Sequence, residues 1–319
     1  HLLNLGIKPE KILLLTFTNK AASEMIERLN RYFDKQITSK ITAGTFHSVS
    51  FSLLKSLDKG VTLKQPSELK TLLKSLVERR KFYHLSDVKP YGGAYLYDLY
   101  SLFQNSEQGT TFGKWISDKS EEQGVYAEIY EDVLEEFEAE KAKFSYADFN
   151  DLLIKMRDEL KNGANLAYDE ILIDEYQDTN YAQVSIISQL AETHRRICVV
   201  GDDYQSIYSF RGANIDNILD FKHKFDDAKL FKLERNYRST QLIVQAANSL
   251  MKHNERQIPK DVFSKEAEGD KILYKPCYSD REEAMVVANE LKRIKRNDDC
   301  DYGCATLYLV LSLSVVLGK

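Results

Sequence analysis

The sequence is poor in residues that break or cross-link a chain. Its 319 residues include only 14 glycines, 5 prolines and 4 cysteines. So little glycine and proline excludes collagen-like repeats and a low-complexity chain. The cysteines form no Cys-x-x-Cys pair, which argues against a structural zinc site and a disulfide scaffold. We therefore expect a reduced, cytosolic protein. The four cysteines are Cys198, Cys277, Cys300 and Cys304.

An excess of positive charge and a long apolar run are also missing. The net charge of -5 and the isoelectric point near 5.8 argue against nucleic-acid binding by overall basicity, although a local basic channel is compatible with them. The apolar residues 305–317 would span only ~20 Å as a helix, against ~30 Å of bilayer hydrocarbon. We expect a buried strand or helix there. Residues 1–6 carry no targeting signal and are typical of a last helical turn that ends at Gly6.

What the chain does contain is 43% hydrophobic residues, arranged as alternating strands and helices. Short apolar runs typical of buried parallel strands alternate with segments that have apolar residues at helical spacing. The length suggests roughly two domains, and the alternation predicts a doubly wound α/β fold with a parallel sheet. The expected strands are 11–17, 41–46, 171–173 and 196–200, and the expected helices are 20–33, 46–57 and a segment that reaches about 191.

Between these units, residues 66–143 show no buried strand and are predicted to form a helical insertion. Residues 64–84 contain six Lys or Arg and two Glu, whereas residues 118–140 contain ten Asp or Glu and one Lys. Both charge runs are compatible with solvated helix faces. Alternatively, the basic run contacts a phosphate backbone and the acidic run faces water or a partner.

The strand predicted at 171–173 runs directly into Asp174 and Glu175. Ligands bind at the carboxyl ends of strands in open α/β sheets, so two carboxylates there are candidates for chemistry. An aspartate in this place can hold Mg²⁺ through water, and a neighbouring glutamate can deprotonate an attacking water. Acidic residues at a helix N-terminus, where they favour the helix dipole, are the structural alternative.

Two further polar clusters follow. After the strand at 196–200, Gln205 can bond a terminal phosphate or a water, Tyr208 and Phe210 can stack on unpaired bases, and Arg211 can pair with phosphate. Core packing explains the two aromatic residues separately but not their interleaving with Gln205 and Arg211.

The other cluster is at 233–240. Here Ser239 or Thr240 can cap the next helix. Just before that helix, Tyr237 and Arg238 suit a nucleotide, because the ring can stack on a base while the guanidinium neutralises phosphate.

Taken together, the ordered motifs resemble the UvrD/Rep/PcrA group of superfamily 1 DNA helicases. Six segments resemble the family's motifs in the family's order, and they cover most of the chain outside the helical insertion. The segments are 15–22 (motif Ia), 44–48 (motif Ib), 144–153 (the Asp-Phe motif), 174–178 (motif II), 201–213 (motif III) and 233–240 (motif IV).

The resemblance implies the site residues and their roles. It implies a Mg²⁺ ligand in Asp174, a general base in Glu175, a γ-phosphate sensor in Gln205, an adenine-stacking ring in Tyr237 and an arginine finger in Arg238. ATP and Mg²⁺ are the implied cofactors, and single-stranded DNA or a junction between duplex and single strand is the implied partner. The positions that match the family's DNA track are Phe17, Asn19, His47, Tyr208, Phe210 and Arg211.

The fold implied by the resemblance is a RecA-like P-loop NTPase sheet with a helical insertion and the beginning of a second RecA-like domain. Domain 1A would comprise residues 1–65 and 144–230, without its first strand and phosphate loop. Domain 1B would be the insertion at 66–143, and 231–319 would begin domain 2A.

The sequence also departs from the family pattern. It contains no Gly-x-x-x-x-Gly-Lys-Thr loop, no Gln motif and no motif V or VI, and it is apolar at 309–315 where the family has polar residues.

The first hypothesis is an ATP-dependent 3′–5′ DNA helicase. The second is a nucleic-acid-binding module that does not hydrolyse ATP. Under both hypotheses this chain alone should show negligible ATPase activity. A nuclease that uses Asp174, Glu175 and Asp178 is weaker, because no second acidic cluster stands out.

Overall fold

The computed structural model describes residues 1–80, 88–106, 109–164, 166, 168–194, 196–225 and 227–298. They form two compact units, each described by itself. The first is His1–Lys232 with Asn254–Pro259, and the second is Leu233–His253 with the described part of Lys260–Lys319. The apolar run at 305–317, for which a buried strand or helix is expected, lies outside the described residues, as do Cys300 and Cys304.

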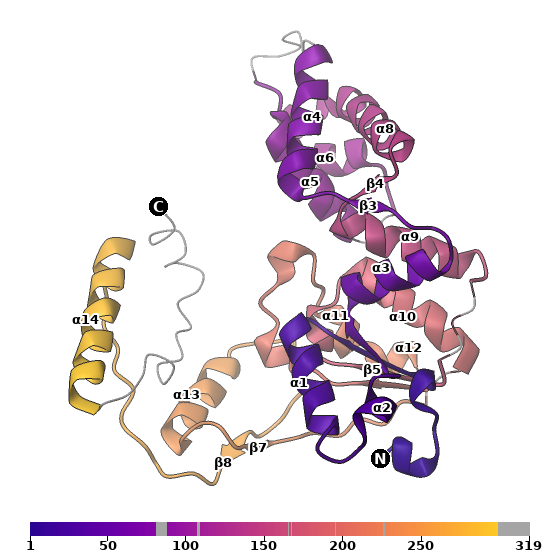
Figure 1. Ribbon diagram of the computed structural model, residues 1–319. Coiled ribbons are helices and arrows are strands. Elements are labelled where there is room, and N and C mark those ends of the chain that lie inside the picture. The colour runs from indigo at the N-terminus through magenta and orange to yellow at the C-terminus, as the bar shows by residue number, and fades with distance from the viewer. Residues whose placement is uncertain are drawn as a thin grey trace. The chain divides into compact units, whose positions relative to one another are not determined.

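Four parallel strands form the main sheet of the first unit (Figure 1), in the order β2-β1-β5-β6. The run Ile-Leu-Leu-Leu-Thr of β1 is almost wholly buried, as its apolar character on both faces predicts. The expected α/β class with a parallel sheet is confirmed and is consistent with a RecA-like domain. The strands are β1 (Ile12–Thr16), β2 (Thr42–Thr45), β5 (Glu170–Ile173) and β6 (Ile197–Val199).

Side-chain caps set where the main helices of this unit begin. Thr18 accepts a hydrogen bond from the backbone amide of Ala21 at 3.1 Å, and capping boxes start the helices that follow Thr45 and Asp148. The helices are α1 (Asn19–Leu29), α3 (Phe46–Ser56), α9 (Phe149–Lys161) and α10 (Tyr181–His194).

The helix expected at 20–33 ends at Leu29, earlier than its apolar spacing suggests. There, Asn30 accepts a hydrogen bond from the Thr38 hydroxyl of the next helix, α2 (Lys35–Thr38). This contact favours a turn over a longer helix, because the Asn30 side chain is held by a segment that folds back on α1.

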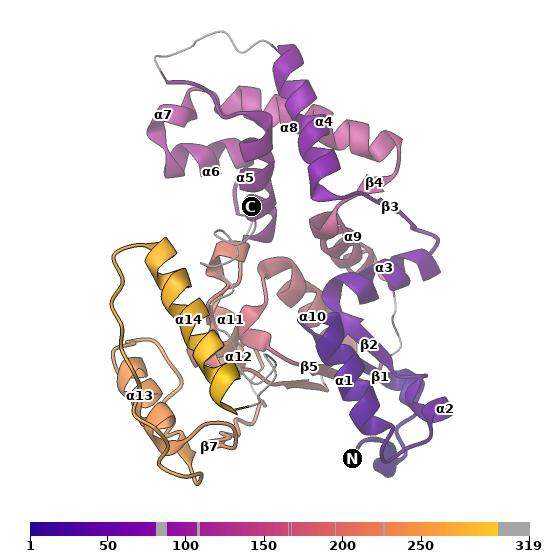
Figure 2. The ribbon, with the colours of Figure 1, turned by 60° about the vertical axis from the view of Figure 1, so that its left-hand side comes forward.

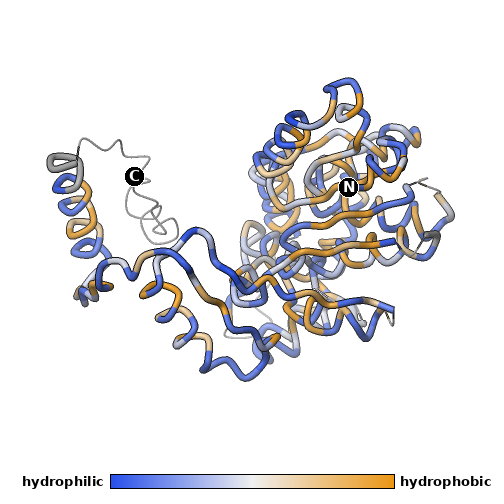
Figure 3. The backbone as a smooth tube through the Cα atoms, turned by 90° about the horizontal axis from the view of Figure 1, so that it is seen from below, coloured by the Kyte–Doolittle hydropathy of each residue, from blue (hydrophilic) through white to orange (hydrophobic). Residues whose placement is uncertain are grey.

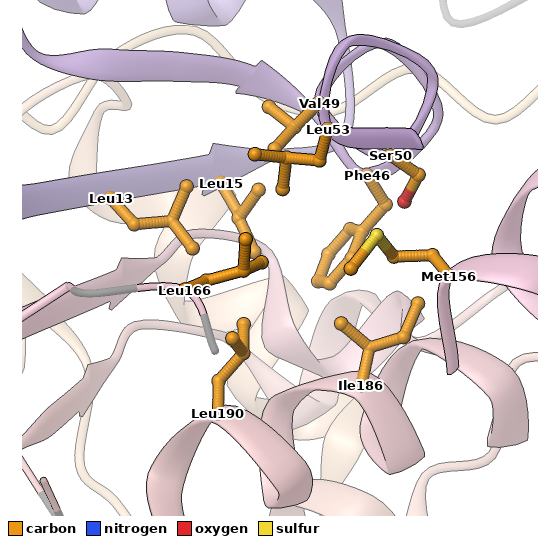
Figure 4. Close-up of a pocket in the computed structure, with 10 residues that line it drawn as sticks. All are labelled: Leu13, Leu15, Phe46, Val49, Ser50, Leu53, Met156, Leu166, Ile186 and Leu190. Carbon is orange, nitrogen blue, oxygen red and sulfur yellow. The ribbon is translucent and has the colours of Figure 1, made fainter. Parts of the chain in front are cut away.

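One layer of helices covers the sheet face formed by Leu13, Leu15, Ile171 and Ile173. Helices α3, α9 and α10 pack there (Figure 1). In Figure 4, Leu13 and Leu15 of β1 point into a small apolar cavity that also receives side chains from these three helices. The cavity belongs to the core of the unit.

The predicted insertion is helical and has its own core. Figure 2 shows its helices gathered into one bundle, around buried Leu, Phe and Tyr side chains. Gly93 lies so close to the neighbouring helix that an added Cβ would stand 2.5 Å from the Cα of Lys74. The helices are α4 (Pro66–Arg80), α5 (Gly93–Asn105), α6 (Phe112–Lys119), α7 (Glu121–Gly124) and α8 (Ala127–Lys143).

The two opposite charge runs of the insertion partly pair with each other. Arg80 lies 3.2 Å from a carboxylate oxygen of Asp132 and 3.4 Å from one of Glu136, and Arg79 lies 3.7 Å from Glu136. These pairs are exposed and each stabilises the protein by at most about 1 kcal/mol. Part of each charge run is therefore paired inside the fold, where α4 packs on α8.

The first unit also contains several short elements that lie between its main helices and strands. A two-residue parallel ladder of β3 and β4 joins the insertion to the sheet unit at both of its ends. No helix in the described ranges has the length and apolar character needed to cross a membrane. The short elements of the first unit are η1 (Leu3–Leu5), η2 (Pro9–Lys11), β3 (Thr62–Leu63), β4 (Tyr146–Ala147), η3 (Tyr176–Asp178), η4 (Asp203–Gln205), η5 (Ser209–Arg211), α11 (Asp216–Leu219) and α12 (Phe221–Lys224).

The second unit contains β7 (Arg235–Asn236), α13 (Gln241–Met251), β8 (Phe263–Ser264) and α14 (Asp280–Asp298). In Figure 3, hydrophobic and hydrophilic residues occupy different sides of α14, the helix at the far left of the picture. Among residues 233–253 and 260–293 of this unit, Val244 is the one buried residue. The described residues of the second unit therefore do not enclose a core of their own.

Candidate nucleotide and nucleic-acid site

The predicted site residues of the first unit follow the carboxyl ends of its strands. Leu15 is in register with Ile173, and Ile173 is in register with Val199. Just beyond these pairs, the amide of Asp174 donates to the carbonyl of Leu15 at 2.9 Å, and the amide of Tyr176 donates to that of Val200 at 2.9 Å. The segments that contain motifs Ia, II and III in the resemblance are thus brought to one edge of the sheet.

The acidic pair sits in an unusual backbone turn. Glu175 has a φ of 53°, in the left-handed region that non-glycine residues seldom occupy. Such a conformation is kept where the surrounding contacts enforce it, often at functional sites. Here the turn ends β5 and starts η3. Consequently the two carboxylates stand at the strand end and not within a regular helix.

The donor set at this turn fits a magnesium ion. Among the described residues, the carboxylate of Asp174 takes part in no hydrogen bond or ion pair given by the structure, and it is partly exposed. A carboxylate oxygen open to water is the ligand type that Mg²⁺ prefers. The described ranges contain no group of three or more His, Cys, Asp or Glu placed to hold a metal ion. A site at Asp174 would therefore rely on water and phosphate oxygens for its other ligands.

Gln177 links the acidic pair to the next strand, a role not predicted from the sequence. It is 1% exposed. Its Nε2 donates to Oε2 of Glu175 at 2.9 Å, and its Oε1 accepts the backbone amide of Asp202 at 2.9 Å. An added Cβ at Gly201 would stand 2.7 Å from that Oε1, so the close approach requires a glycine. The feature of the sequence that could have indicated this role is the position of Gln177 between the acidic residues Glu175 and Asp178, in a buried stretch.

Gln205 completes this hydrogen-bonded path. Its Nε2 donates to Oδ2 of Asp202 at 2.7 Å, and Oδ1 of Asp202 accepts the amide of Tyr204 at 3.1 Å. Gln205 itself is exposed on η4. The path therefore runs from Glu175 through Gln177 and Asp202 to an exposed amide.

Three of the six predicted DNA-track residues form one aromatic cluster. The ring centroids of Phe17 and Tyr208 are 5.2 Å apart, and those of Tyr208 and Phe210 are 5.9 Å apart. Phe210 is 57% exposed. Asn19 is exposed at the first residue of α1, and Arg211 belongs to η5. The cluster offers partly open ring faces on which bases can stack.

His47 lies with Phe149, an aromatic residue to which the sequence analysis gave no role. Their rings meet edge to face with centroids 5.6 Å apart, and Phe149 is 40% exposed. Burial lowers the pKa of His47, and the nearby Asp148 carboxylate opposes that shift only in part. A neutral imidazole beside an open ring suits base stacking better than phosphate pairing. The feature of the sequence that could have indicated a role for Phe149 is its position directly after Asp148, which caps α9.

The second unit carries the two remaining predicted residues, Tyr237 and Arg238, just before α13. Tyr237 is 72% exposed, and the guanidinium carbon of Arg235 lies 4.4 Å from its ring centroid. The amide of Arg238 donates to Oδ1 of Asn236 at 2.9 Å. The structure thus places Arg235, which the sequence analysis did not single out, on the tyrosine ring.

The expected side-chain cap of α13 is not formed. Thr240 stands at the N-cap position but its side chain makes no capping hydrogen bond, and its buried hydroxyl has no partner among the described residues. Ser239 instead offers its carbonyl to the Ser264 hydroxyl at 2.6 Å. The prediction of a cap by Ser239 or Thr240 is therefore wrong, because β8 engages this turn.

Comparison with known proteins places this chain in a family. The model of the UvrD/REP helicase N-terminal domain matches residues 1–226, and that of the UvrD-like helicase C-terminal domain matches residues 231–309. The chain belongs to the UvrD/Rep/PcrA-like superfamily 1 helicases. The resemblance inferred from the ordered motifs is therefore confirmed.

Three bacterial proteins are similar to this UvrD-like chain. It is 31% identical to the ATP-dependent DNA helicase PcrA of Leuconostoc citreum over 96% of the chain and 41% of that protein. It is 35% identical to DNA helicase II of Rickettsia typhi over 91% of the chain and 45% of that protein. PcrA of Staphylococcus epidermidis is 31% identical over 98% of the chain and 43% of its own length. The chain spans less than half the length of these relatives.

One carboxyl of the UvrD-like site gives a pH-dependent prediction. Burial, with the charge of Glu175, raises the pKa of Asp178 to about 6, and its Oδ1 is buried without a partner among the described residues. A raised folded-state pKa contributes stability that is full below the unfolded value near 3.8 and is lost as pH rises through about 6. We expect Asp178→Asn to gain stability relative to wild type at pH 7.5 but not at pH 4.5.

Urea unfolding at the two pH values measures this difference, and Asp227→Asn is the control because Asp227 is exposed in the same unit. An equal stability difference at both pH values would show that Asp178 is ionised normally in the folded protein.

Proposed function

We propose that this chain is part of an ATP-dependent DNA helicase that moves 3′ to 5′ along single-stranded DNA. The observation that carries the proposal is the hydrogen-bonded path from Glu175 through Gln177 and Asp202 to Gln205. The path starts at a carboxylate suited to deprotonate water, and it ends three residues before Tyr208 of the aromatic cluster. A movement at one end of this hydrogen-bonded path can therefore be transmitted to the other end.

ATP with Mg²⁺ is the proposed cofactor, and when bound it supplies the phosphoanhydride bond whose hydrolysis drives movement. Asp174 would hold the magnesium ion through water. Glu175 accepts the proton of the attacking water, and Gln205 orients that water or the terminal phosphate. In the second unit, Tyr237 would stack on the adenine of a bound nucleotide, and Arg238 would neutralise charge on the transferred phosphoryl group.

Single-stranded DNA is the proposed partner, at the edge of duplexes with single-stranded tails. The exposed ring of Phe210 and the partly exposed rings of Phe17 and Tyr208 support stacking on successive bases, at about 1–3 kcal/mol per base. His47 with Phe149 supplies a second pair of rings, while Asn19 and Arg211 supply polar contacts. The names of the relatives, DNA helicase II and ATP-dependent DNA helicase, agree with this partner.

The division into domains is part of the same proposal. Domain 1A comprises 1–65 and 144–230, the insertion 1B comprises 66–143, and 231–319 begins domain 2A. The separate apolar core of the insertion supports the second of these, and the change of family model between 226 and 231 supports the last. A cytosolic setting, expected from the few cysteines, completes the proposal.

A strand-separation assay tests the function. The complete protein encoded by the gene for this chain is mixed with short duplexes that carry either a 3′ or a 5′ single-stranded tail. We expect ATP-dependent separation of the 3′-tailed duplex only. Separation of the 5′-tailed duplex alone would reverse the proposed direction. Binding of the tails without any ATP hydrolysis would instead favour the non-hydrolysing nucleic-acid-binding module.

A further inference from the structure

Asn105 is the last residue of α5, and both the nitrogen and the oxygen of its side-chain amide form hydrogen bonds. Nδ2 donates to the carbonyl of Ser101 at 3.0 Å and to Oδ1 of Asn150 at 3.1 Å. Oδ1 accepts a hydrogen bond from Nδ2 of Asn180 at 2.7 Å. Because both N–H groups and the carbonyl have partners, the orientation of this amide is fixed. One insertion residue thereby joins α9 to the start of α10.

The Asn180 end of this contact belongs to the segment that follows the acidic pair. Oδ1 of Asn180 accepts the amide of Gln183 at 3.0 Å, which caps α10, and Asn180 forms an isolated bridge with Ala213. Next to it, the carbonyl of Thr179 accepts Nδ2 of Asn217 at 2.9 Å. The segment after Asp178 is thus tied both to Asn105 and to the loop after Phe210.

That loop also packs directly on Asn105. Gly212 ends η5 with a φ of +86°, and an added Cβ there would stand 2.6 Å from the Cβ of Asn105. Tyr208 and Phe210 lie just before this glycine in the chain. Their backbone is therefore held against the end of α5 by a contact that leaves no room for a side chain.

The Asn150 end of the contact leads to the second pair of rings. Nδ2 of Asn150 donates to the Ser101 hydroxyl at 2.6 Å, so α9 is fixed to α5 by several hydrogen bonds. Asn150 directly follows Phe149, which meets His47. Both groups of aromatic residues are therefore anchored, through short stretches of backbone, to one amide of the insertion.

We propose that Asn105 is a positioning residue that holds the two aromatic groups in one arrangement for single-stranded nucleic acid. It touches neither substrate nor nucleotide itself. This inference rests on the proposed function and adds to it a specific role for the insertion. Its physical basis is that a side-chain amide with all its groups hydrogen-bonded is costly to break.

The test is a double-mutant cycle in the complete protein, read by fluorescence anisotropy of a labelled oligo(dT). Asn105→Ala and Asn180→Ala are each expected to raise the dissociation constant roughly tenfold, the scale of one lost, partly buried hydrogen bond. Because the two residues share that bond, the double variant should be about as weak as either single one. The half-saturating DNA concentration for ATPase stimulation should rise by the same factor, with the rate at saturating DNA unchanged.

Two further variants separate positioning from general damage. Asp98→Asn, on the exposed side of the same helix, is the matched control and should bind like wild type. Gly212→Ala keeps the Asn105 amide, but its added Cβ pushes the backbone of the Gly212 loop away from Asn105. This variant should weaken binding even if Asn105→Ala fails to fold. Its normal binding would then overturn the inference.

The outcomes also separate this inference from the proposed function. If wild type binds oligo(dT) and Asn105→Ala binds equally well while only its unfolding temperature falls, the role is structural and the inference is wrong. If wild type does not bind oligo(dT) at all, the proposed function is wrong and the inference falls with it.

Discussion

Glu175→Gln is expected to slow DNA-stimulated ATP hydrolysis by the complete protein roughly 10²–10⁴-fold, the usual contribution of a positioned general base. Glutamine has the shape of glutamate, and its Oε1 can still accept the Nε2–H of Gln177, so the turn at the end of β5 should be retained. What the variant loses is the ability to take a proton from water. Steady-state hydrolysis at saturating DNA measures the effect.

The control for this variant is Glu24→Gln, on the outer part of α1, whose carboxylate pairs only loosely with Lys20 at 3.9 Å. Its rate should equal that of wild type. Glu175→Gln should also retain wild-type affinity for single-stranded DNA, because Glu175 is not among the aromatic groups. A Glu175→Gln protein that hydrolyses ATP at the normal rate would remove Glu175 from the proposed mechanism.

Lys141→Met is expected to lower the free energy of unfolding by about 3–5 kcal/mol, the cost of leaving a buried charge without its partner. Lys141 is 2% exposed, and its Nζ lies 2.9 Å from Asp151 and 2.8 Å from Glu138. Burial by itself lowers the pKa of Lys141, but these carboxylates outweigh it and the net pKa is raised. The lysine therefore stays charged and compensates the acids around it.

The surrounding network explains why this loss is large. Oδ2 of Asp151 also accepts the amide of Asp148 at 2.8 Å, and Oδ2 of Asp148 accepts the Tyr97 hydroxyl at 2.8 Å. Burial, with the charge of Asp148, raises the pKa of Asp151. Without Lys141, these carboxylates would repel one another where α5, α8 and α9 meet.

Urea unfolding followed by the fluorescence of Trp115, the only tryptophan of this chain, measures the effect. Lys143→Met is the matched control, because Lys143 is exposed on the same helix. The double variant Lys141→Met/Asp151→Asn should recover part of the lost stability, since it removes a buried negative charge as well. If Lys141→Met unfolds like Lys143→Met, the buried ion pair contributes nothing measurable.

Much of the site could be predicted because it follows local rules. Strands that are buried on both faces read as continuous apolar runs, and parallel strands bring their carboxyl ends to one edge. Asp174, Glu175 and Gln205 could thus be assigned to that edge from the residues around them. The capping box at Thr45 and the cap at Thr18 are likewise local, since each joins residues three apart.

The contacts missed from the sequence join residues far apart in the chain. Asn105 and Asn180 are 75 positions apart, and Gln177 meets the amide of Asp202 25 positions away. An amide in the sequence has no preferred distant partner, so its role depends on which elements the fold brings beside it. The pairing of Arg80 with Asp132 has the same origin, because it required α4 to pack on α8.

The amino-acid sequence by itself determined the alternating strands and helices, the helical insertion and the acidic pair at a strand end, since hydrophobic periodicity and capping act over a few residues. Only the tertiary structure decided that Gln177 connects Glu175 to Gln205 and that Asn105 joins both aromatic groups to the insertion. Hydrogen bonds between side chains require their donors and acceptors within about 3 Å, and packing alone brings distant parts of the chain that close.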